Sequence, residues 1–291
     1  ESKSDEYIKE YLKCILNRKN VDDVENNAWR VQDARKTLMK EEDISKCFTK
    51  ILYRPFDVRN IFYHDSVIRR TRKNIMQHMM RENLGLCVGR AGQVVGEKAW
   101  NLVFISENII DLNLFYRGGE SFFPLYLYPE KASTKKRAFG TMMLFEPTEE
   151  YDSKRPNISP KLFDSLNSEY KISITPEDIF YYIYAVLYSN VYRDKYAEFL
   201  KRDFPRIAFT REYKIFDKMV QCGKDLADFH LLKSAGLNSS VTKYQGSGDN
   251  MIEKIIYDNK KKRVLINKDN YFDMVQNKVW EYQIGGYQVC E

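Results

Sequence analysis

The 291-residue sequence contains few residues of the kinds that build metal centres or disulfide frameworks. Its five cysteines are odd in number, scattered, and include no Cys-x-x-Cys pair, which argues against a zinc knuckle and against a disulfide framework. This cysteine usage suits a reducing compartment, so we expect a cytoplasmic location. The three histidines, His64, His78 and His230, also lie far apart. Because isolated histidines are more often structural than metal-binding, we expect no metal site.

The motifs of several enzyme classes are missing. No GxxxxGK[ST] loop, GxSxG elbow or HExxH helix occurs. The segment Gly246–Asn250 lacks the third glycine of a nucleotide-binding loop, so we interpret it as a turn. Two acid-x-Lys triplets, Glu169–Lys171 near Asp164 and Glu212–Lys214 near Asp217, have the residue types of a Mg²⁺-dependent nuclease. Such triplets also arise by chance in a chain with 30% charged residues, so a cryptic nuclease stays a minor hypothesis.

Long apolar runs and a signal peptide are also missing, so we expect no membrane partner. The sequence begins Glu-Ser-Lys-Ser without an initiator Met, and we therefore expect a piece of a longer protein. With 43% hydrophobic residues, the chain can bury a core, and its length suits one large domain or two ordinary ones. A net charge of +6 is compatible with a nucleic-acid partner without requiring one.

Hydrophobic periodicity predicts an α+β fold, with irregular sheets of short strands flanked by helices and a helical segment at the N-terminus. We expect a helical spacer or docking segment over 1–50 and one recognition domain over 51–291, with a possible internal boundary near the loop-like stretch 131–160. The predicted helices cover 5–47, 74–81, 176–202 with a break at 189–190, and 212–233. The predicted strands cover 51–53, 61–63, 85–89, 102–106, 122–128, 255–257 and 263–266.

Four ordered motifs carry a family resemblance. They are Tyr53–Arg59 (YRPFDVR), Phe123–Pro129 (FPLYLYP), Leu200–Ile207 (LKRDFPRI) and Ile284–Val289 (IGGYQV). Together with shorter blocks between them, they resemble the C-terminal region of type ISP restriction-modification enzymes and related single-chain N6-adenine DNA methyltransferases. The resemblance covers roughly residues 50 to 289. It implies a target-recognition domain that reads duplex DNA and positions an upstream methyltransferase and nuclease.

The resemblance also implies what this chain leaves to other parts of such an enzyme. The methyltransferase's Asn-Pro-Pro-Tyr-type motif and glycine-rich cofactor loop are not in the sequence, nor are the translocase motifs. We therefore expect no catalytic activity and no cofactor here, with S-adenosylmethionine, Mg²⁺ and ATP required only by the full-length enzyme. The expected partners are double-stranded DNA and the methyltransferase domain of the same polypeptide. The alternative is a docking module that touches DNA only through phosphates.

Individual DNA contacts are predicted from residue type and position. Arg90 and Gln93 leave a predicted strand into a glycine-flanked loop, and Arg117 lies beside Gly118 and Gly119, so we predict that these three side chains read bases. Clusters of Lys and Arg suit the DNA backbone because they neutralise phosphates and release counterions. The predicted phosphate contacts are Arg69, Arg70, Arg72, Lys73, Lys135, Lys136 and Arg137.

Three other conspicuous groups are assigned structural roles. We expect Asp57 to pair with an arginine and fix the turn of its motif. The aromatic residues from Phe180 to Tyr188 have helical spacing and are expected in the core. The basic residues from Lys260 to Lys262 are expected to form a polar turn between two strands.

Overall fold

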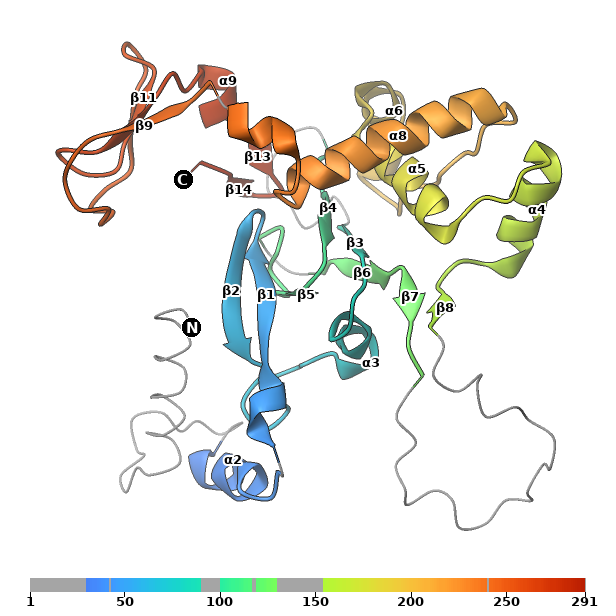
Figure 1. The fold of residues 1–291 in the computed structure, drawn as a ribbon, viewed down its shortest axis with the longest axis horizontal. Helices are drawn as coiled ribbons and strands as arrows, with labels where there is room; N and C mark the ends of the chain where they lie inside the picture. The colour runs from blue at the N-terminus through green and yellow to red at the C-terminus, as the bar shows by residue number, and fades with distance from the viewer. Residues whose placement is uncertain are drawn as a thin grey trace.

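The structure is a computed structural model, and it describes residues 30–41, 43–89, 100–116, 119–129, 154–239 and 241–290. Its mixture of helices with several small sheets confirms the predicted α+β class (Figure 1). Most of the predicted N-terminal helical segment lies outside these ranges. In the described part of the chain, no helix is both long enough and apolar enough to cross a membrane.

A ribbon of two antiparallel strands and a short third strand form the first sheet. β1 (Phe48–Arg54) pairs with β2 (Asp57–Phe62), and β5 (Ile109–Ile110) joins β1 in parallel. The turn at Pro55 and Phe56 closes the ribbon at the end where Arg54 faces Asp57. Phe56 has a positive φ of 66°, which is unusual for a bulky residue. Its ring packs edge-on against Phe104 in the core, so the Phe56 side chain fixes the turn to the core.

The second sheet is buried at the centre of the molecule. Its order is β4 (Val103–Ser106), β3 (Gly85–Val88) and β6 (Ser121–Pro124), all antiparallel. Every residue of β3 and β4 is buried, which explains why both segments are continuous apolar runs in the sequence. Both strands were predicted correctly.

Two long helices pack beside this sheet. α5 (Pro176–Tyr188) begins with a capping box, in which Thr175 accepts a hydrogen bond from the Asp178 amide at 3.1 Å and Asp178 accepts one from the Thr175 amide at 2.7 Å. α5 ends at Ser189, whose hydroxyl accepts a hydrogen bond from the amide of Tyr192 and caps the next helix, α6 (Asn190–Lys195). This confirms the predicted break. The second long helix, α8 (Tyr213–His230), packs against α5 and β4.

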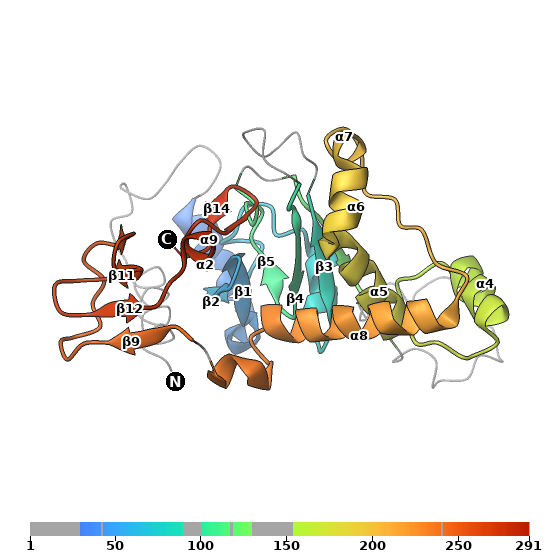
Figure 2. The ribbon, with the colours of Figure 1, turned by 90° about the horizontal axis from the view of Figure 1, so that it is seen from above.

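The remaining elements lie around this centre. Figures 1 and 2 show the C-terminal four-stranded sheet at one end of the molecule and α4 at the other. That sheet has the order β10, β11, β12, β9, and β7 pairs with β8 and β13 with β14. The bounds are α2 (Val31–Leu38), η1 (Ile44–Cys47), α3 (Lys73–Met76), η2 (Gln77–Met79), β7 (Tyr126–Leu127), β8 (Arg155–Pro156), α4 (Pro160–Tyr170), α7 (Ala197–Leu200), η6 (Ala235–Ser239), β9 (Lys243–Gln245), β10 (Ile256–Asp258), β11 (Arg263–Leu265), β12 (Tyr271–Asp273), α9 (Asn277–Trp280), β13 (Gln283–Ile284) and β14 (Tyr287–Gln288).

Several sequence predictions were wrong in detail. The helix predicted over 5–47 ends at Leu38, because the chain then turns into η1 and β1. The single strand predicted over 122–128 is divided at Leu125 into β6 and β7, which belong to different sheets. Helix α4 was not predicted at all, and α9 interrupts a region expected to contain only strands. By contrast, the turn at 260–262 between β10 and β11 is confirmed.

The end of α8 is joined to the core through His230. Its Nδ1 lies 2.6 Å from the hydroxyl of Tyr184, a fully buried residue of α5. The imidazole also stacks on Phe104 and contacts Phe56 edge-on. The predicted core position of the aromatic run in α5 is thereby confirmed, and His230 has the structural role expected of an isolated histidine.

Acid should destabilise this junction. Burial, together with nearby Arg193, lowers the pKa of His230 to about 4, from 6.5 for an ordinary histidine. Because the folded state favours the neutral imidazole, the stability contributed by His230 is present above pH 6.5 and is lost as the pH falls toward 4. We expect thermal denaturation from pH 7.5 to 4.5 to show a falling Tm, with a shallower fall in His230→Gln. An equally steep fall in the variant would contradict this assignment.

Candidate nucleic-acid interface

The structure describes only part of the predicted DNA-contacting set. Arg69, Arg70, Arg72 and Lys73 are described, and all four are exposed. The predicted base readers and the second phosphate cluster lie outside the described residues, so their predicted roles stay predictions. These residues are Arg90, Gln93, Arg117, Lys135, Lys136 and Arg137. The residues on either side of the segments that contain them are nevertheless described.

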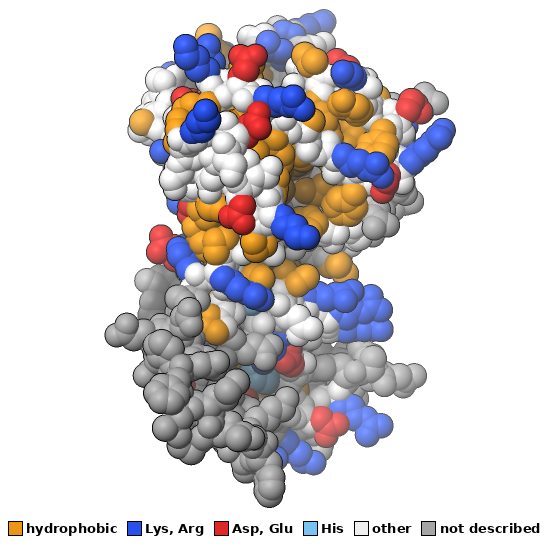
Figure 3. Space-filling view, turned by 90° about the vertical axis from the view of Figure 1, so that its right-hand side faces the viewer, with side chains coloured by type: hydrophobic (Ala, Val, Ile, Leu, Met, Phe, Trp, Pro, Cys, Tyr) orange, Lys and Arg blue, Asp and Glu red, His pale blue; other side chains and the backbone are white. Residues whose placement is uncertain are grey.

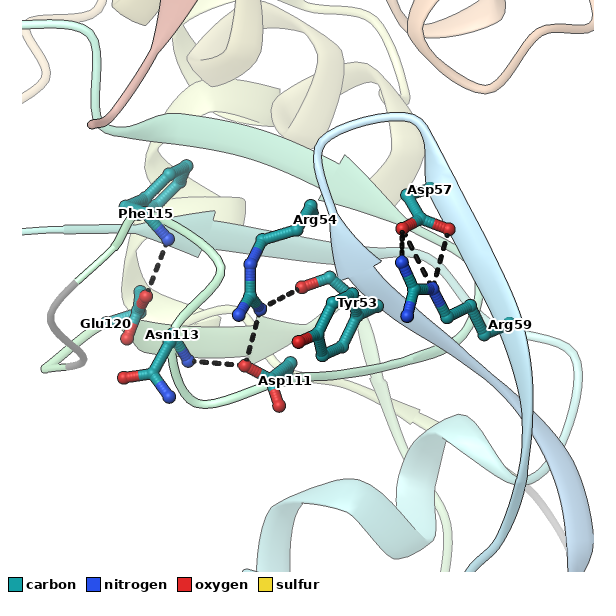
Figure 4. A network of polar contacts seen from close by, with 8 residues as sticks. All are labelled: Tyr53, Arg54, Asp57, Arg59, Asp111, Asn113, Phe115 and Glu120. Carbon is teal, nitrogen blue, oxygen red and sulfur yellow. Dashed lines mark hydrogen bonds and ion pairs between the residues drawn. The ribbon is translucent and has the colours of Figure 1, made fainter. Parts of the chain in front are cut away.

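The turn of the β1–β2 ribbon carries a stack of rings and guanidinium groups. The guanidinium carbon of Arg54 lies 3.8 Å from the ring centre of Tyr53 and 4.9 Å from that of Tyr287. On the other side, Arg59 lies 4.1 Å from the Tyr53 ring centre. Figure 4 shows the Tyr53 ring between the two arginines. Each contact of this kind contributes roughly 0.5–1 kcal/mol at an exposed site.

Arg54 connects this turn to the loop that leads toward Arg117. Its Nη1 lies 2.8 Å from an Asp111 carboxylate oxygen, which also accepts a hydrogen bond from the Asn113 amide at 2.8 Å. Further along, Glu120 accepts a hydrogen bond from the Phe115 amide at 2.8 Å and closes the loop (Figure 4). Burial raises the pKa of Glu120, and its second oxygen has no partner among the described residues.

The C-terminal hairpin β13–β14 holds the same loop from another side. The amide of Gly286 donates to the Phe115 carbonyl at 3.1 Å, and Tyr287 packs edge-on against Tyr116. Gly285 has a φ of +61°, and a Cβ there would lie 2.8 Å from the Phe115 backbone. Only glycine fits this close approach. The Gly-Gly-Tyr motif therefore allows the C-terminal hairpin to pack against the residues that precede Arg117.

The flanks of the predicted base readers meet at this end of the molecule. A Cβ on Gly89, the residue before Arg90, would lie 3.1 Å from the Phe115 ring, two residues before Arg117. On the other side of that segment, Trp100 donates to the Gly89 carbonyl at 3.3 Å. The described residues that flank segments 90–99 and 117–118 therefore lie close together.

The first basic cluster lies at the opposite end of the ribbon. It follows Phe62, which pairs with Phe48 at the far end of β1 and β2 from Arg54. A strand of six residues spans about 20 Å, so the two ends lie about that far apart. Along a duplex this distance corresponds to roughly six base pairs. The described flanks of the predicted base readers and the first basic cluster therefore lie at opposite ends of the ribbon.

Local hydrogen bonds hold this basic cluster in place, but they leave most of its positive charge without a neutralising partner among the described residues. Asp65 accepts hydrogen bonds from Thr71 and, at 3.4 Å, from Lys73, and the Thr71 hydrogen bond is the main reason for its lowered pKa. Arg69, Arg70 and Arg72 form no ion pair with any described residue. Three exposed arginines without acidic partners in the described part of the chain suit the DNA backbone, whereas Lys73 is partly offset by Asp65.

The four described residues that are predicted to contact DNA all belong to the first basic cluster, so the other surfaces hold none of them. In the described ranges, no group of three or more His, Cys, Asp or Glu side chains could hold a metal ion. Figure 3 shows the side of the molecule where α4 lies, with hydrophobic and basic side chains interspersed. A groove of about 570 Å³ there is lined by 155–160 together with Leu127, Phe163 and Asp164. The pairing of β7 with β8 brings the two ends of the segment containing Lys135 to the same side.

Comparison with known families decides the identity of the chain. The family model described as the Type ISP C-terminal specificity domain matches residues 1–291. The chain belongs to this family. This confirms the resemblance carried by the sequence motifs, and it extends that resemblance over the whole chain. No curated protein matches the chain.

Solved structures share the fold of this specificity domain. The cryo-EM structure of a DrdV–DNA complex matches with a TM-score of 0.65 and 21% identity, over 97% of this chain and 27% of that one. The ATP-dependent Type ISP restriction-modification enzyme LlaBIII bound to DNA matches with 0.65 and 20%, over 97% and 17%. A nuclease-deletion mutant of the Type ISP enzyme LlaGI, in complex with a DNA substrate mimic, matches with 0.57 and 21%, over 90% and 21%. The specificity domain thus spans about a quarter or less of these chains.

Sequence reasoning missed part of the site. Asp57 was expected to pair with an arginine, and its pairing with Arg59 is confirmed. The roles of Asp111, Glu120 and Tyr287 were not predicted. The motifs containing Tyr53 and Tyr287 are each recognisable in the sequence, but they lie more than 200 residues apart. Their contact in the specificity domain is a property of the tertiary fold.

Proposed function

We propose that this specificity domain recognises a particular duplex DNA sequence and places the adenine methyltransferase of the same polypeptide on it. The observation that carries the proposal is the match of the whole chain to a family of specificity domains. The similar chains of DrdV, LlaBIII and LlaGI were solved with DNA or a DNA mimic, which supports DNA as the partner. Catalysis and the binding of S-adenosylmethionine, Mg²⁺ and ATP belong, in this proposal, to the rest of a cytoplasmic enzyme.

The geometry supports separate roles for two regions of the domain, one that reads bases and one that binds phosphates. Segments 90–99 and 117–118, whose described flanks Gly89 and Phe115 lie close together, would supply side chains to base edges, where specificity arises. The cluster at Arg69, Arg70 and Arg72 would bind phosphates farther along the duplex and set the register. Arg54 and Tyr287 would hold the base-reading end rigid, because they connect the ribbon turn, the loop and the C-terminal hairpin.

The test is selection from a randomised duplex pool at two salt concentrations, followed by sequencing of the bound DNA. We expect one short asymmetric motif to be enriched, and weaker binding of all DNA at the higher salt concentration. Salt-sensitive binding without any enriched motif would instead identify a docking module that contacts only phosphates. Mg²⁺-dependent cutting by the isolated chain, lost in Lys171→Gln, would support the nuclease hypothesis.

A further inference from the structure

Arg59 is held in one orientation by two neighbours. Its Nε lies 2.9 and 3.1 Å from the two carboxylate oxygens of Asp57, and its Nη2 lies 2.6 Å from one of them. The Tyr53 ring covers a face of the guanidinium at 4.1 Å. Figure 4 shows this carboxylate and ring fixing the group from two directions. Asp57 and Arg59 are two residues apart on one strand, so both side chains point to the same face.

This arrangement contributes little to stability. The side chain of Arg59 is 57% exposed and that of Asp57 is 36% exposed. Exposed ion pairs of this kind are screened by water and salt, and many contribute nothing measurable. A long side chain that is fixed in place on the surface has lost conformational freedom without burying itself. The result is an arginine whose orientation is set before any ligand arrives, which lowers the entropic cost of binding.

The donors of Arg59 are divided between two edges of the guanidinium. Asp57 occupies the edge formed by Nε and Nη2. Nη1 and the outward N–H of Nη2 form the other edge, and no described residue accepts a hydrogen bond from Nη1. Two parallel N–H donors at this spacing match the O6 and N7 acceptors of guanine in the major groove.

The charge of the pair favours a base over a phosphate. Asp57 offsets the positive charge of Arg59, so the pair as a whole exerts little long-range attraction on the DNA backbone. The N–H donors of Arg59 on the edge away from Asp57 remain available to a ligand. Both residues lie on β2, the edge strand of its three-stranded sheet, next to the turn that Phe56 fixes to the core. The same stack reaches Tyr287, which contacts Tyr116 next to the predicted base reader Arg117.

We propose that Arg59, positioned by Asp57 and Tyr53, reads one guanine of the target in the major groove. This inference rests on the proposed function and adds a specificity-determining residue that sequence reasoning assigned to no DNA contact. It requires that the target contain a G·C pair.

The experiment repeats the selection with wild-type protein, Arg59→Gln, Asp57→Ala and the control Arg202→Gln. Arg202 is exposed and lies after α7, away from the ribbon, and its replacement changes net charge as Arg59→Gln does. In Arg59→Gln we expect the preference for guanine at one position to fall about 10- to 100-fold, with the other positions kept. Arg202→Gln should keep the full motif.

The Asp57→Ala variant distinguishes the effect of holding Arg59 in one orientation from the effect of the charge of Asp57. Removing a carboxylate makes the protein more positive, so binding to a random 30-base-pair duplex should strengthen or stay unchanged, as fluorescence anisotropy would show. Discrimination at the same guanine should nevertheless fall several-fold, because Arg59 is no longer held. Equal weakening of all sequences by Arg59→Gln, or an enriched wild-type motif without a G·C pair, would overturn the inference while leaving the proposed function intact. If the wild type enriches no motif, both fail.

Discussion

Replacing Gly223 with valine should lower the free energy of unfolding by about 3 kcal/mol or more. Gly223 lies in the middle of α8, where a Cβ would stand 2.0 Å from the carbonyl oxygen of Tyr181 in α5. The obstacle is backbone, so it cannot rotate away as a side chain could. The helices would have to separate, which would disturb the contact between His230 and Tyr184.

The measurement is thermal or urea denaturation of the purified variant, with Gly236→Ala as the control. Gly236 lies in η6, where an added Cβ would meet the flexible end of the Phe229 side chain at 3.3 Å. The control should change stability by less than about 0.5 kcal/mol. Because glycine is a poor helix former, propensity alone predicts that a substitution at Gly223 stabilises α8. A stabilised Gly223→Val protein would show that the two helices do not approach this closely.

Removing the three arginines of the first basic cluster that form no ion pair with a described residue should weaken binding to every duplex by about a hundredfold at low salt. Suitable replacements are Arg69→Gln, Arg70→Asn and Arg72→Asn. Arg70 and Arg72 have φ values of 64° and 53°, a region that asparagine tolerates better than most residues. Each lost phosphate contact should reduce the slope of log affinity against log salt by about 0.9. Fluorescence anisotropy at four salt concentrations measures both effects.

The matched control removes the same charge from another part of the surface. Lys161, Lys214 and Lys218 are exposed on α4 and α8, and their replacement by glutamine also lowers the net charge by three. If binding depended only on overall charge, both triple variants would behave alike. We expect the control to keep most of the affinity and the salt slope. Target preference should survive in the arginine variant, because phosphates carry no sequence information.

Local sequence determined much of the secondary structure. The capping box at Thr175 and the break at Ser189 follow from side chains that bond to nearby backbone, so they are visible in a short window. The fully apolar strands β3 and β4 were recognisable for a similar reason, since burial on both faces requires a continuous hydrophobic run. The sequence does not predict α4, because the stretch before it is rich in Pro, Ser and Thr and therefore indicates a loop as far as residue 160.

The sequence by itself also determined the family, through ordered motifs, and the residue types suited to DNA. Only the tertiary structure decided how those motifs meet. It brings Arg54, which stacks on Tyr53, against Tyr287, places Gly89 beside Phe115, and sets the basic cluster at the far end of the ribbon. The physical reason is that these contacts join segments distant along the chain. Their energies depend on packing between sheets and helices, which no local pattern of residues encodes.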